Sequence, residues 1–368
     1  MPELSTQKPP EDSLADIVID LSMAGLPATT AKTRRGNARR LRTAIVRAGS
    51  QQIGRLTAAM EHAAEAAAGT TTPGPEDTHD PFRLVPRWHF AMLNDTERNE
   101  ALARAIQEIV RPGDLVLDIG AGAGLLAMLA ARAGAAKVIS CEVNPLVAEI
   151  ARQVVTAHGL SDVVTVVPTY SYNLQIGREL SRPADVILSE IVDCGLIGEG
   201  ILPTMRDART RLLAPGGRLL PGRARIYGAL CESEAIHRLN RVDTALGFDV
   251  SLMNVVATAG HHPVRLSTWP HTLLTETAEL AEFAFADGPL DEGSAKIALP
   301  VQRAGVAHGV VAWFAMDLTP TVTLRNDPGN PGSHWMQAYI PFDQPRHLAA
   351  GEVHEFTLRW SDTQLRTA

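Results

Sequence analysis

Two glutamates, Glu190 and Glu199, lie nine residues apart in a hydrophobic loop with glycines at 195, 198 and 200. The loop follows the apolar run 184–188, which predicts a buried strand. In open α/β sheets, ligands bind beyond the carboxyl ends of the strands. Two carboxylates there suit a planar cation such as a guanidinium, whose five N–H donors form a fixed fork. Taken alone, two glutamates around a loop are more often solvated or helix-capping residues, so the pattern needs support from the rest of the chain.

A second pattern predicts a ligand-binding turn. The apolar run 115–119 predicts a buried strand that leads into Gly120, Gly122 and Gly124. Glycine allows positive φ and lets a ligand approach the backbone closely, and the helix that follows presents unpaired N–H groups. The next predicted strand ends near Glu142, an acid placed to bind two ribose hydroxyls when adjacent strands hold the turn and the acid.

The details of this turn favour S-adenosylmethionine over a dinucleotide. Asp118 lies inside the strand, just before the first glycine, and we expect it to contribute to the cofactor site. The pattern GxGxG lacks the third glycine of dinucleotide-binding turns. S-Adenosylmethionine has a zwitterionic amino-acid end and no pyrophosphate to cradle, so it fits such a turn.

The elements that must position these residues predict an α/β fold. Strand-like and helical runs alternate between residues 94 and 221, as in a parallel Rossmann-like sheet with helices on both faces. After Pro221, short β-rich runs separated by turn residues predict an antiparallel β-barrel. We therefore expect a helical extension and linker at 1–80, a cofactor domain at 81–221 and a substrate domain at 222–368.

The N-terminal extension is rich in arginine. Residues 31–68 predict a helix, because apolar residues recur there at helical spacing. No aromatic residues interleave with the charges, which favours a solvated face packed on the body or on a second subunit over a nucleic-acid-binding arm.

Composition excludes several other classes of protein. The formal net charge of -7 argues against charge-driven nucleic-acid binding. The three cysteines have no CxxC spacing, so we expect no disulfide framework, no metal site and a reducing cytoplasm. No signal-peptide pattern and no long apolar run are visible, which predicts a cytoplasmic protein without a membrane partner.

Four segments, in order, resemble the protein arginine N-methyltransferase family, and its monomethylating (type III) branch most closely. They are FAMLNDTERN, VLDIGAGAGLL, SEIVDCGLIGEGILP and GSHWMQAYIPF, and the resemblance runs from about Phe82 to Trp360. It implies a class I methyltransferase domain that uses S-adenosylmethionine. It also implies that Glu190 and Glu199 clamp the guanidinium of an arginine and act in its Nω-methylation.

The resemblance assigns further roles. His334 would form an ion pair with Asp95 that aligns the active site and supports proton removal. Arg98 would hold the cofactor carboxylate, Met92 would lie beside the transferred methyl group, and Trp335 would contact the substrate. Without the resemblance, His334 would be interpreted as a structural histidine and Arg98 as a solvated helix residue.

Two departures from the family pattern concern the entrance to the site. The tyrosines that precede the MLxD segment in the family are absent from DPFRLVPRWHF, where Phe82, Trp88 or His89 could cover the cofactor. The usual acid near the adenine is absent from PTYSYNL, where Ser171 and Tyr172 are the candidates. These departures leave the identity of the substrate open.

Several functions therefore stay in view. The first is methylation of free L-arginine to Nω-methyl-L-arginine, as in the biosynthesis of nitrosourea natural products. The alternatives are methylation of arginine in a protein or peptide, methylation of an unrelated small molecule, and a cofactor-binding regulatory protein without activity. The family resemblance also implies a homodimer, with an arm near residues 239–254 that docks on the partner.

Overall fold

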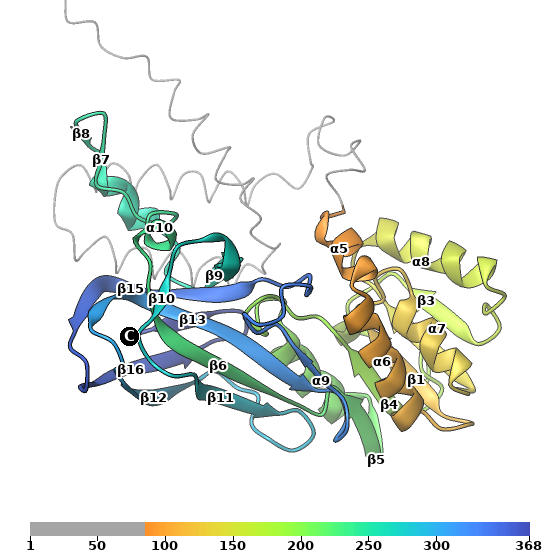
Figure 1. Cartoon of the computed structure of the whole chain (residues 1–368). Helices are drawn as coiled ribbons and strands as arrows, with labels where there is room; N and C mark the ends of the chain where they lie inside the picture. The colour runs from red at the N-terminus through yellow and green to blue at the C-terminus, as the bar shows by residue number, and fades with distance from the viewer. Residues whose placement is uncertain (1–84) are drawn as a thin grey trace, which may run out of the picture. The chain divides into compact units, whose positions relative to one another are not determined.

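The computed structural model describes residues 85–368 (Figure 1). The predicted N-terminal extension and Phe82 lie outside these residues. The first half of the described part contains, in chain order, α5 (Trp88–Asn94), α6 (Thr96–Ile109), β1 (Leu115–Ile119), α7 (Leu125–Arg132), β2 (Lys137–Cys141), α8 (Pro145–Ala157), β3 (Val164–Val167), η1 (Ser171–Asn173), β4 (Ala184–Ser189), α9 (Ile201–Arg211) and β5 (Leu213–Leu220).

These strands form one parallel sheet in the order β3-β2-β1-β4-β5. All five residues of β1 are buried, as expected for a central parallel strand that is covered on both faces. The expected Rossmann-like core is therefore confirmed. The strand order reverses between β1 and β4, so the loops after these two strands border the crevice where such sheets bind ligands.

The second half is mainly antiparallel. It contains β6 (Arg223–Glu232), α10 (Glu234–His237), β7 (Thr244–Ala245), β8 (Phe248–Asp249), η2 (Ser251–Val256), β9 (His262–Val264), η3 (Leu266–Thr268), β10 (Thr272–Leu273), β11 (Ala278–Ala284), β12 (Gly293–Pro300), β13 (Gly305–Asp317), β14 (Thr323–Arg325), β15 (Gln337–Leu348), β16 (Val353–Trp360) and β17 (Leu365–Thr367).

Two sheets make up this half. The larger has the order β10-β6-β13-β15-β9, with β11 on β6 and β14 on β13, and the smaller has the order β12-β16-β17. Phe342 of the larger sheet packs edge-on against Phe356 of the smaller, with ring centroids 5.9 Å apart. The apolar cluster that contains these rings continues into the parallel sheet through Leu220 and Ile226, so one core supports both halves. The expected antiparallel domain is confirmed.

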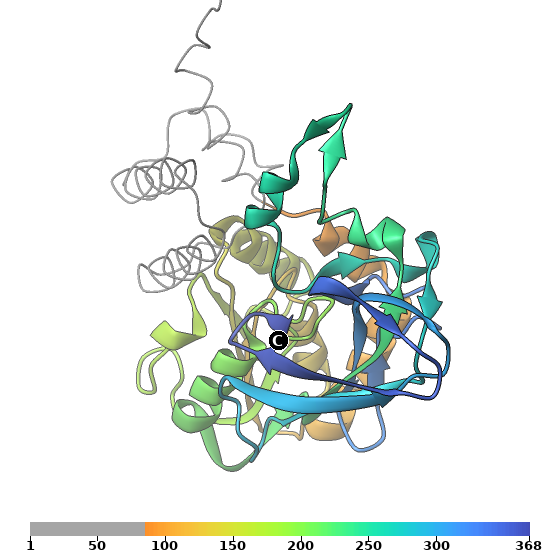
Figure 2. The ribbon, with the colours of Figure 1, turned by 90° about the vertical axis from the view of Figure 1, so that its left-hand side faces the viewer.

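A hairpin formed by β7 and β8 extends away from the sheets (Figures 1 and 2). Its tip carries Leu246, which is fully exposed, and Phe248, which is 73% exposed. Among residues 85–368, no helix is both long enough and apolar enough to cross a membrane.

Candidate active site

The turn after β1 is shaped by three glycines with positive φ. Gly120, Gly122 and Gly124 have φ values of 89°, 50° and 85°. A Cβ at Gly120 would lie 2.6 Å from Cγ2 of Ile191, which belongs to the loop after β4. The glycine at 120 is therefore required twice, once by its backbone conformation and once by the close approach of the two loops.

Glu142 follows β2 and faces this turn. Its Oε2 accepts a hydrogen bond from the N–H of Gly122 at 3.0 Å, and its Oε1 accepts one from the N–H of Asn144 at 2.9 Å. Each carboxylate oxygen has a second lone pair, so Glu142 is oriented by the backbone and can still accept bonds from two ligand hydroxyls.

A cavity of about 400 Å³ lies at the carboxyl ends of β1, β2 and β4. Its wall contains most of the residues predicted for the site, namely Met92, Arg98, Gly120, Gly122, Glu142, Ser171, Glu190 and Glu199. The loops after three neighbouring strands thus bring the predicted cofactor and acceptor residues into one space. The other predicted residues, Asp95, Asp118, Gly124, His334 and Trp335, lie outside this wall.

Arg98 is the buried cation of the site. It is 2% exposed, and its Nε–H and Nη2–H donate to Oε1 and Oε2 of Glu190, the first at 3.1 Å. Its Nη1 donates to Oδ1 of Asn99 at 2.7 Å. Three of the five guanidinium N–H groups are used in this way, which leaves two that can reach the carboxylate of a ligand.

Glu199 differs from Glu190 in its electrostatic surroundings. Desolvation raises the pKa of Glu199 to about 8 although the residue keeps solvent exposure, and the charges of Glu190, Asp193 and Glu142 act in the same direction. A cluster of carboxylates in a partly dry cavity stabilises a bound cation, and it favours the neutral acid when no cation is present. The geometry and the charge therefore suit a guanidinium ligand.

Asp95 and His334 are paired, as the family resemblance implies. Oδ2 of Asp95 lies 2.8 Å from Nδ1 of His334 and also accepts the backbone N–H of His334 at 2.9 Å. Its Oδ1 caps α6 by accepting the N–H of Arg98 at 3.0 Å. Burial raises the pKa of Asp95, but these hydrogen bonds outweigh burial and hold the pKa below its usual range.

Burial lowers the pKa of His334, against the opposing effect of Asp95. Since Asp95 is held as the anion, the ring of His334 donates from Nδ1 and carries an unprotonated Nε2 at neutral pH. The pair thus presents a neutral imidazole with a fixed tautomer.

Two residues that were predicted to bind the cofactor have other contacts. Asp118 is fully buried within the sheet, its Oδ2 accepts the hydroxyl of Ser140 at 2.6 Å, and burial raises its pKa to about 7. Gly124 begins α7, and a Cβ there would meet Val155 and Ala151 of α8 at 3.5 and 3.7 Å. Asp118 therefore links β1 to β2, and Gly124 allows close packing of two helices.

Trp335, which was predicted to contact the substrate, lies outside the cavity wall and beside Arg98. Its indole N–H donates to the carbonyl of Val192 at 3.1 Å, and the Arg98 guanidinium carbon is 6.0 Å from its ring centre. The attraction between this cation and the ring helps to hold Arg98 in place.

Two of the aromatic residues that could cover the cofactor, Trp88 and His89, lie in the cavity wall. The rings of Trp88 and His89 stack with centroids 3.9 Å apart, and both line the cavity. Burial lowers the pKa of His89, while Glu142 opposes this shift. Pro203 and Thr204 of α9 also line the cavity, and neither was predicted, because Thr204 lies just beyond the quoted motif and Pro203 ends it without a polar side chain.

Two sequence models of known families match this chain. The model described as the arginine methyltransferase oligomerization subdomain matches residues 222–367. The model described as ribosomal protein L11 methyltransferase matches residues 101–220. The two matches meet at the junction between the parallel and antiparallel halves.

Characterised relatives extend the match to nearly the whole chain. An arginine N(omega)-methyltransferase of Streptomyces achromogenes subsp. streptozoticus is 49% identical over 93% of this chain and 95% of its own length. Protein arginine N-methyltransferase 7 of Oryza sativa subsp. indica is 35% identical over 64% of this chain, and protein arginine N-methyltransferase 9 of Homo sapiens is 31% identical over 70%. The matches span only 35% and 34% of the lengths of these two larger proteins.

Solved structures show the same fold. The Trypanosoma brucei PRMT1 enzyme–prozyme heterotetrameric complex with AdoHcy aligns with a TM-score of 0.64 and 26% identity, over 74% of this chain and 86% of that chain. Arabidopsis thaliana protein arginine methyltransferase 10 aligns with a TM-score of 0.60 and 22% identity, over 73% and 86%. From the match to the Streptomyces enzyme, the two domain models and the shared fold, the chain belongs to the arginine N-methyltransferase family and is an S-adenosylmethionine-dependent enzyme.

Proposed function

We propose that the enzyme methylates free L-arginine and releases Nω-methyl-L-arginine. The observation that carries this proposal is the 49% identity to an arginine N(omega)-methyltransferase over 95% of that protein's length. The relatives whose names specify protein arginine are matched over only about a third of their length. A role in natural-product biosynthesis and a cytoplasmic location follow as further predictions.

The cavity suits S-adenosylmethionine. Its wall combines a turn kept open by Gly120 and Gly122, a backbone-oriented carboxylate at Glu142 and spare N–H groups on Arg98. We assign Glu142 to the ribose hydroxyls, Arg98 to the amino-acid carboxylate, Met92 to the methyl group and Ser171 to the adenine side. The cofactor supplies a methyl group on a sulfonium, which leaves as a neutral thioether.

The acceptor is held by Glu190 and Glu199. A protonated guanidinium spreads its lone pairs over three nitrogens, which makes each of them a poor nucleophile. Two carboxylates on the other N–H groups draw the positive charge toward them and leave electron density on the nitrogen that faces the methyl carbon. The N–C bond then forms as the C–S bond breaks, and alignment of the two reactants supplies most of the rate.

The methylated nitrogen must then lose a proton. Glu199 suits this step, because a carboxyl group with a pKa of about 8 is a better proton acceptor near neutral pH than an ordinary glutamate. Asp95 and His334 are proposed to support the loss by holding Glu190 and Arg98 in place and by accepting charge. Trp335 would act on substrate binding through Arg98.

We further propose that the cofactor domain covers residues 81–221 and the substrate domain 222–368, and that the enzyme is a homodimer. Exposed apolar residues of the predicted arm support the dimer, since Leu246, Phe248 and Met253 are 100%, 73% and 61% exposed. The match of this half to an oligomerization subdomain also supports it. If the arm docks on a partner, Leu246→Asp with Phe248→Asp should convert the dimer to a monomer in light scattering after size exclusion.

To identify the acceptor, the purified enzyme is incubated with S-adenosylmethionine and either free L-arginine or an Arg-Gly-rich peptide. Mass spectrometry of the products identifies the acceptor and counts the methyl groups. We expect Nω-monomethyl-L-arginine from the free amino acid and much slower turnover of the peptide. Methylation of the peptide alone would refute the free-arginine proposal and favour a protein substrate.

A further inference from the structure

The loop between the two clamp glutamates is closed by the side chain of Asp193. Its Oδ1 accepts hydrogen bonds from the backbone N–H of Gly198 at 2.7 Å and of Gly195 at 3.1 Å. A Cβ at Gly198 would lie 2.2 Å from Oδ2 of Asp193, so glycine is required for this close approach. Gly198 directly precedes Glu199, and one carboxylate therefore fixes the turn that presents Glu199 to the cavity.

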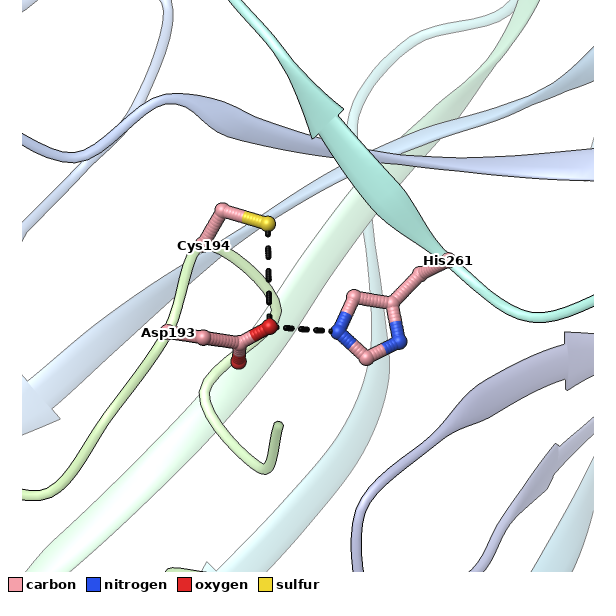
Figure 3. A group of neighbouring side chains, drawn as sticks. All are labelled: Asp193, Cys194 and His261. Atoms are coloured by element: carbon pink, nitrogen blue, oxygen red, sulfur yellow. Dashed lines mark hydrogen bonds and ion pairs between the residues drawn. The ribbon is translucent and has the colours of Figure 1, made fainter. Parts of the chain in front are cut away.

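His261 ties this loop to the antiparallel half. Its Nε2 lies 2.7 Å from Oδ2 of Asp193, and its side chain is 4% exposed (Figure 3). Its backbone N–H donates to the carbonyl of Leu365 in β17 at 2.9 Å, and its Nδ1 accepts the backbone N–H of Leu365 at 3.0 Å. Both ring nitrogens of His261 therefore have a hydrogen-bond partner, Asp193 in the clamp loop and Leu365 in β17.

These contacts determine which ring nitrogen of His261 carries the proton. Because Nδ1 accepts a backbone N–H, it carries no proton, and the neutral ring must therefore carry its proton on Nε2. Nε2–H then donates to the Asp193 carboxylate. Burial raises the pKa of Asp193, but His261 and the loop N–H groups outweigh burial and hold the pKa below its usual range. The carboxylate therefore stays ionised although it is only 25% exposed.

The same assignment argues against a metal ion at this cluster, in which Cys194 lies beside Asp193 and His261 (Figure 3). A metal would need the lone pair of Nε2, and Nδ1 would then have to carry a proton that points at the N–H of Leu365. Burial also raises the pKa of the Cys194 thiol well above its usual range, so the thiolate is disfavoured. Hydrogen bonding accounts for all three side chains.

We propose that Asp193 and His261 are positioning residues that hold Glu199 in register with Glu190 for binding of the acceptor. The inference rests on the proposed function, because it assumes that Glu190 and Glu199 together bind the guanidinium of the acceptor. The pair connects an acceptor-side loop to β17, and none of its described hydrogen bonds goes to a residue assigned to the cofactor. Its loss should therefore weaken use of the acceptor and leave cofactor binding intact.

The test compares His261→Phe, which keeps a ring but removes Nε2–H, with His261→Gln. The glutamine amide nitrogen lies as many bonds from the backbone as Nε2 and can donate to Asp193. The control is His347→Phe, at an exposed position of β15. Steady-state kinetics give kcat and the KM for arginine, calorimetry gives the Kd of S-adenosylhomocysteine, and a thermal melt reports folding.

We expect His261→Phe to lower kcat/KM for arginine by about 10- to 100-fold, as misplacement of a reacting group does. The Kd of S-adenosylhomocysteine should not change, and His261→Gln should recover most of the loss. Wild-type kinetics in His261→Phe would overturn the proposal. A parallel loss of cofactor binding, or a glutamine variant no better than phenylalanine, would also overturn it, because either result indicates a general structural role.

Hydrogen exchange of residues 190–200 in the S-adenosylhomocysteine complex separates this inference from the proposed function. The N–H groups of Gly195 and Gly198 should exchange faster in His261→Phe than in the wild type, because their acceptor is no longer held. Equal exchange would refute the positioning role whatever the acceptor is. If the wild-type enzyme does not methylate arginine but the exchange difference is present, the proposed acceptor is wrong and the role of the pair in the loop stands.

Discussion

Arg98 donates two N–H groups to the two carboxylate oxygens of Glu190, so one clamp glutamate is already paired with a cation of the protein itself. Both side chains are nearly fully buried. Glu199 faces the same cavity, and desolvation raises its pKa to about 8. The two glutamates thus differ in their surroundings: Glu190 is held in a fixed position by Arg98, and we propose that Glu199 ionises when the acceptor binds.

Removing the charge of Arg98 should destabilise the fold. Arg98→Met leaves Glu190 as a buried carboxylate without its cation, which should lower the free energy of unfolding by about 3–5 kcal/mol. Arg98→Lys keeps the charge but loses the paired geometry, so it should fold better and still raise the KM of both substrates. Urea denaturation checks the first expectation. The control is Arg104→Met, at an exposed position of the same helix, which should change the free energy of unfolding by no more than about 0.5 kcal/mol. Equal urea midpoints for Arg98→Met and Arg104→Met would contradict the expectation.

Binding of arginine should strengthen as the pH rises toward 8. The raised pKa of Glu199 means that its carboxyl group is mostly protonated below about pH 8, whereas binding of a guanidinium needs the carboxylate. The Kd of arginine for the S-adenosylhomocysteine complex should therefore rise about tenfold for each pH unit below that pKa and level off above it. Calorimetry across this range measures the slope. Glu199→Gln should bind arginine weakly with no such slope, and an unchanged slope in that variant would assign the titration to another group.

Gly120→Ala and Gly113→Ala form a matched pair. Both glycines have φ near 90°, which an alanine adopts at a cost of about 1–2 kcal/mol. A Cβ at Gly113 has no described heavy atom within 4 Å, whereas a Cβ at Gly120 would lie 2.6 Å from Ile191. Both variants should therefore lose stability, but only Gly120→Ala should also lose binding of S-adenosylmethionine in calorimetry. Equal cofactor binding by the two variants would show that the contact between the loops is not needed.

Asp95→Asn tests the pair with His334 without removing the helix cap. The asparagine oxygen can still accept the N–H of Arg98 and begin α6, but the negative charge beside His334 is lost. If the pair supports proton removal, kcat should fall on the order of 100-fold while the melting temperature changes little. Steady-state measurement of kcat, with arginine and S-adenosylmethionine both saturating, checks this. A normal rate would restrict Asp95 to a structural role.

The parts of the site that could be predicted are those governed by local chain geometry. Gly120, Gly122 and Glu142 belong to one strand–turn–helix–strand unit, in which backbone conformation and strand length fix the spacing. The loop with Glu190 and Glu199 follows a strand of the same sheet, so its place at the crevice also follows from the chain order. These are the residues that the cavity brings together.

What could not be predicted depends on side-chain direction and on distant contacts. β1 is buried on both faces, so no alternation of polar and apolar residues reveals that Asp118 points to Ser140. Trp335 contacts Arg98, far away in the sequence, and the family motif gave no sign of that packing. Asp193 meets His261 across 68 positions, and neither residue belongs to a periodic pattern.

The order of the strands has a consequence for how such an enzyme can change its substrate. The proposed donor turn follows β1 and the proposed clamp follows β4, so the two loops belong to separate βα units. Replacement of the β4 loop alone can alter the acceptor while the donor turn keeps its sequence, provided that the residue facing Gly120 stays compact. Residues 101–220 match a model described as ribosomal protein L11 methyltransferase, a name that specifies another acceptor, and this match agrees with such a division.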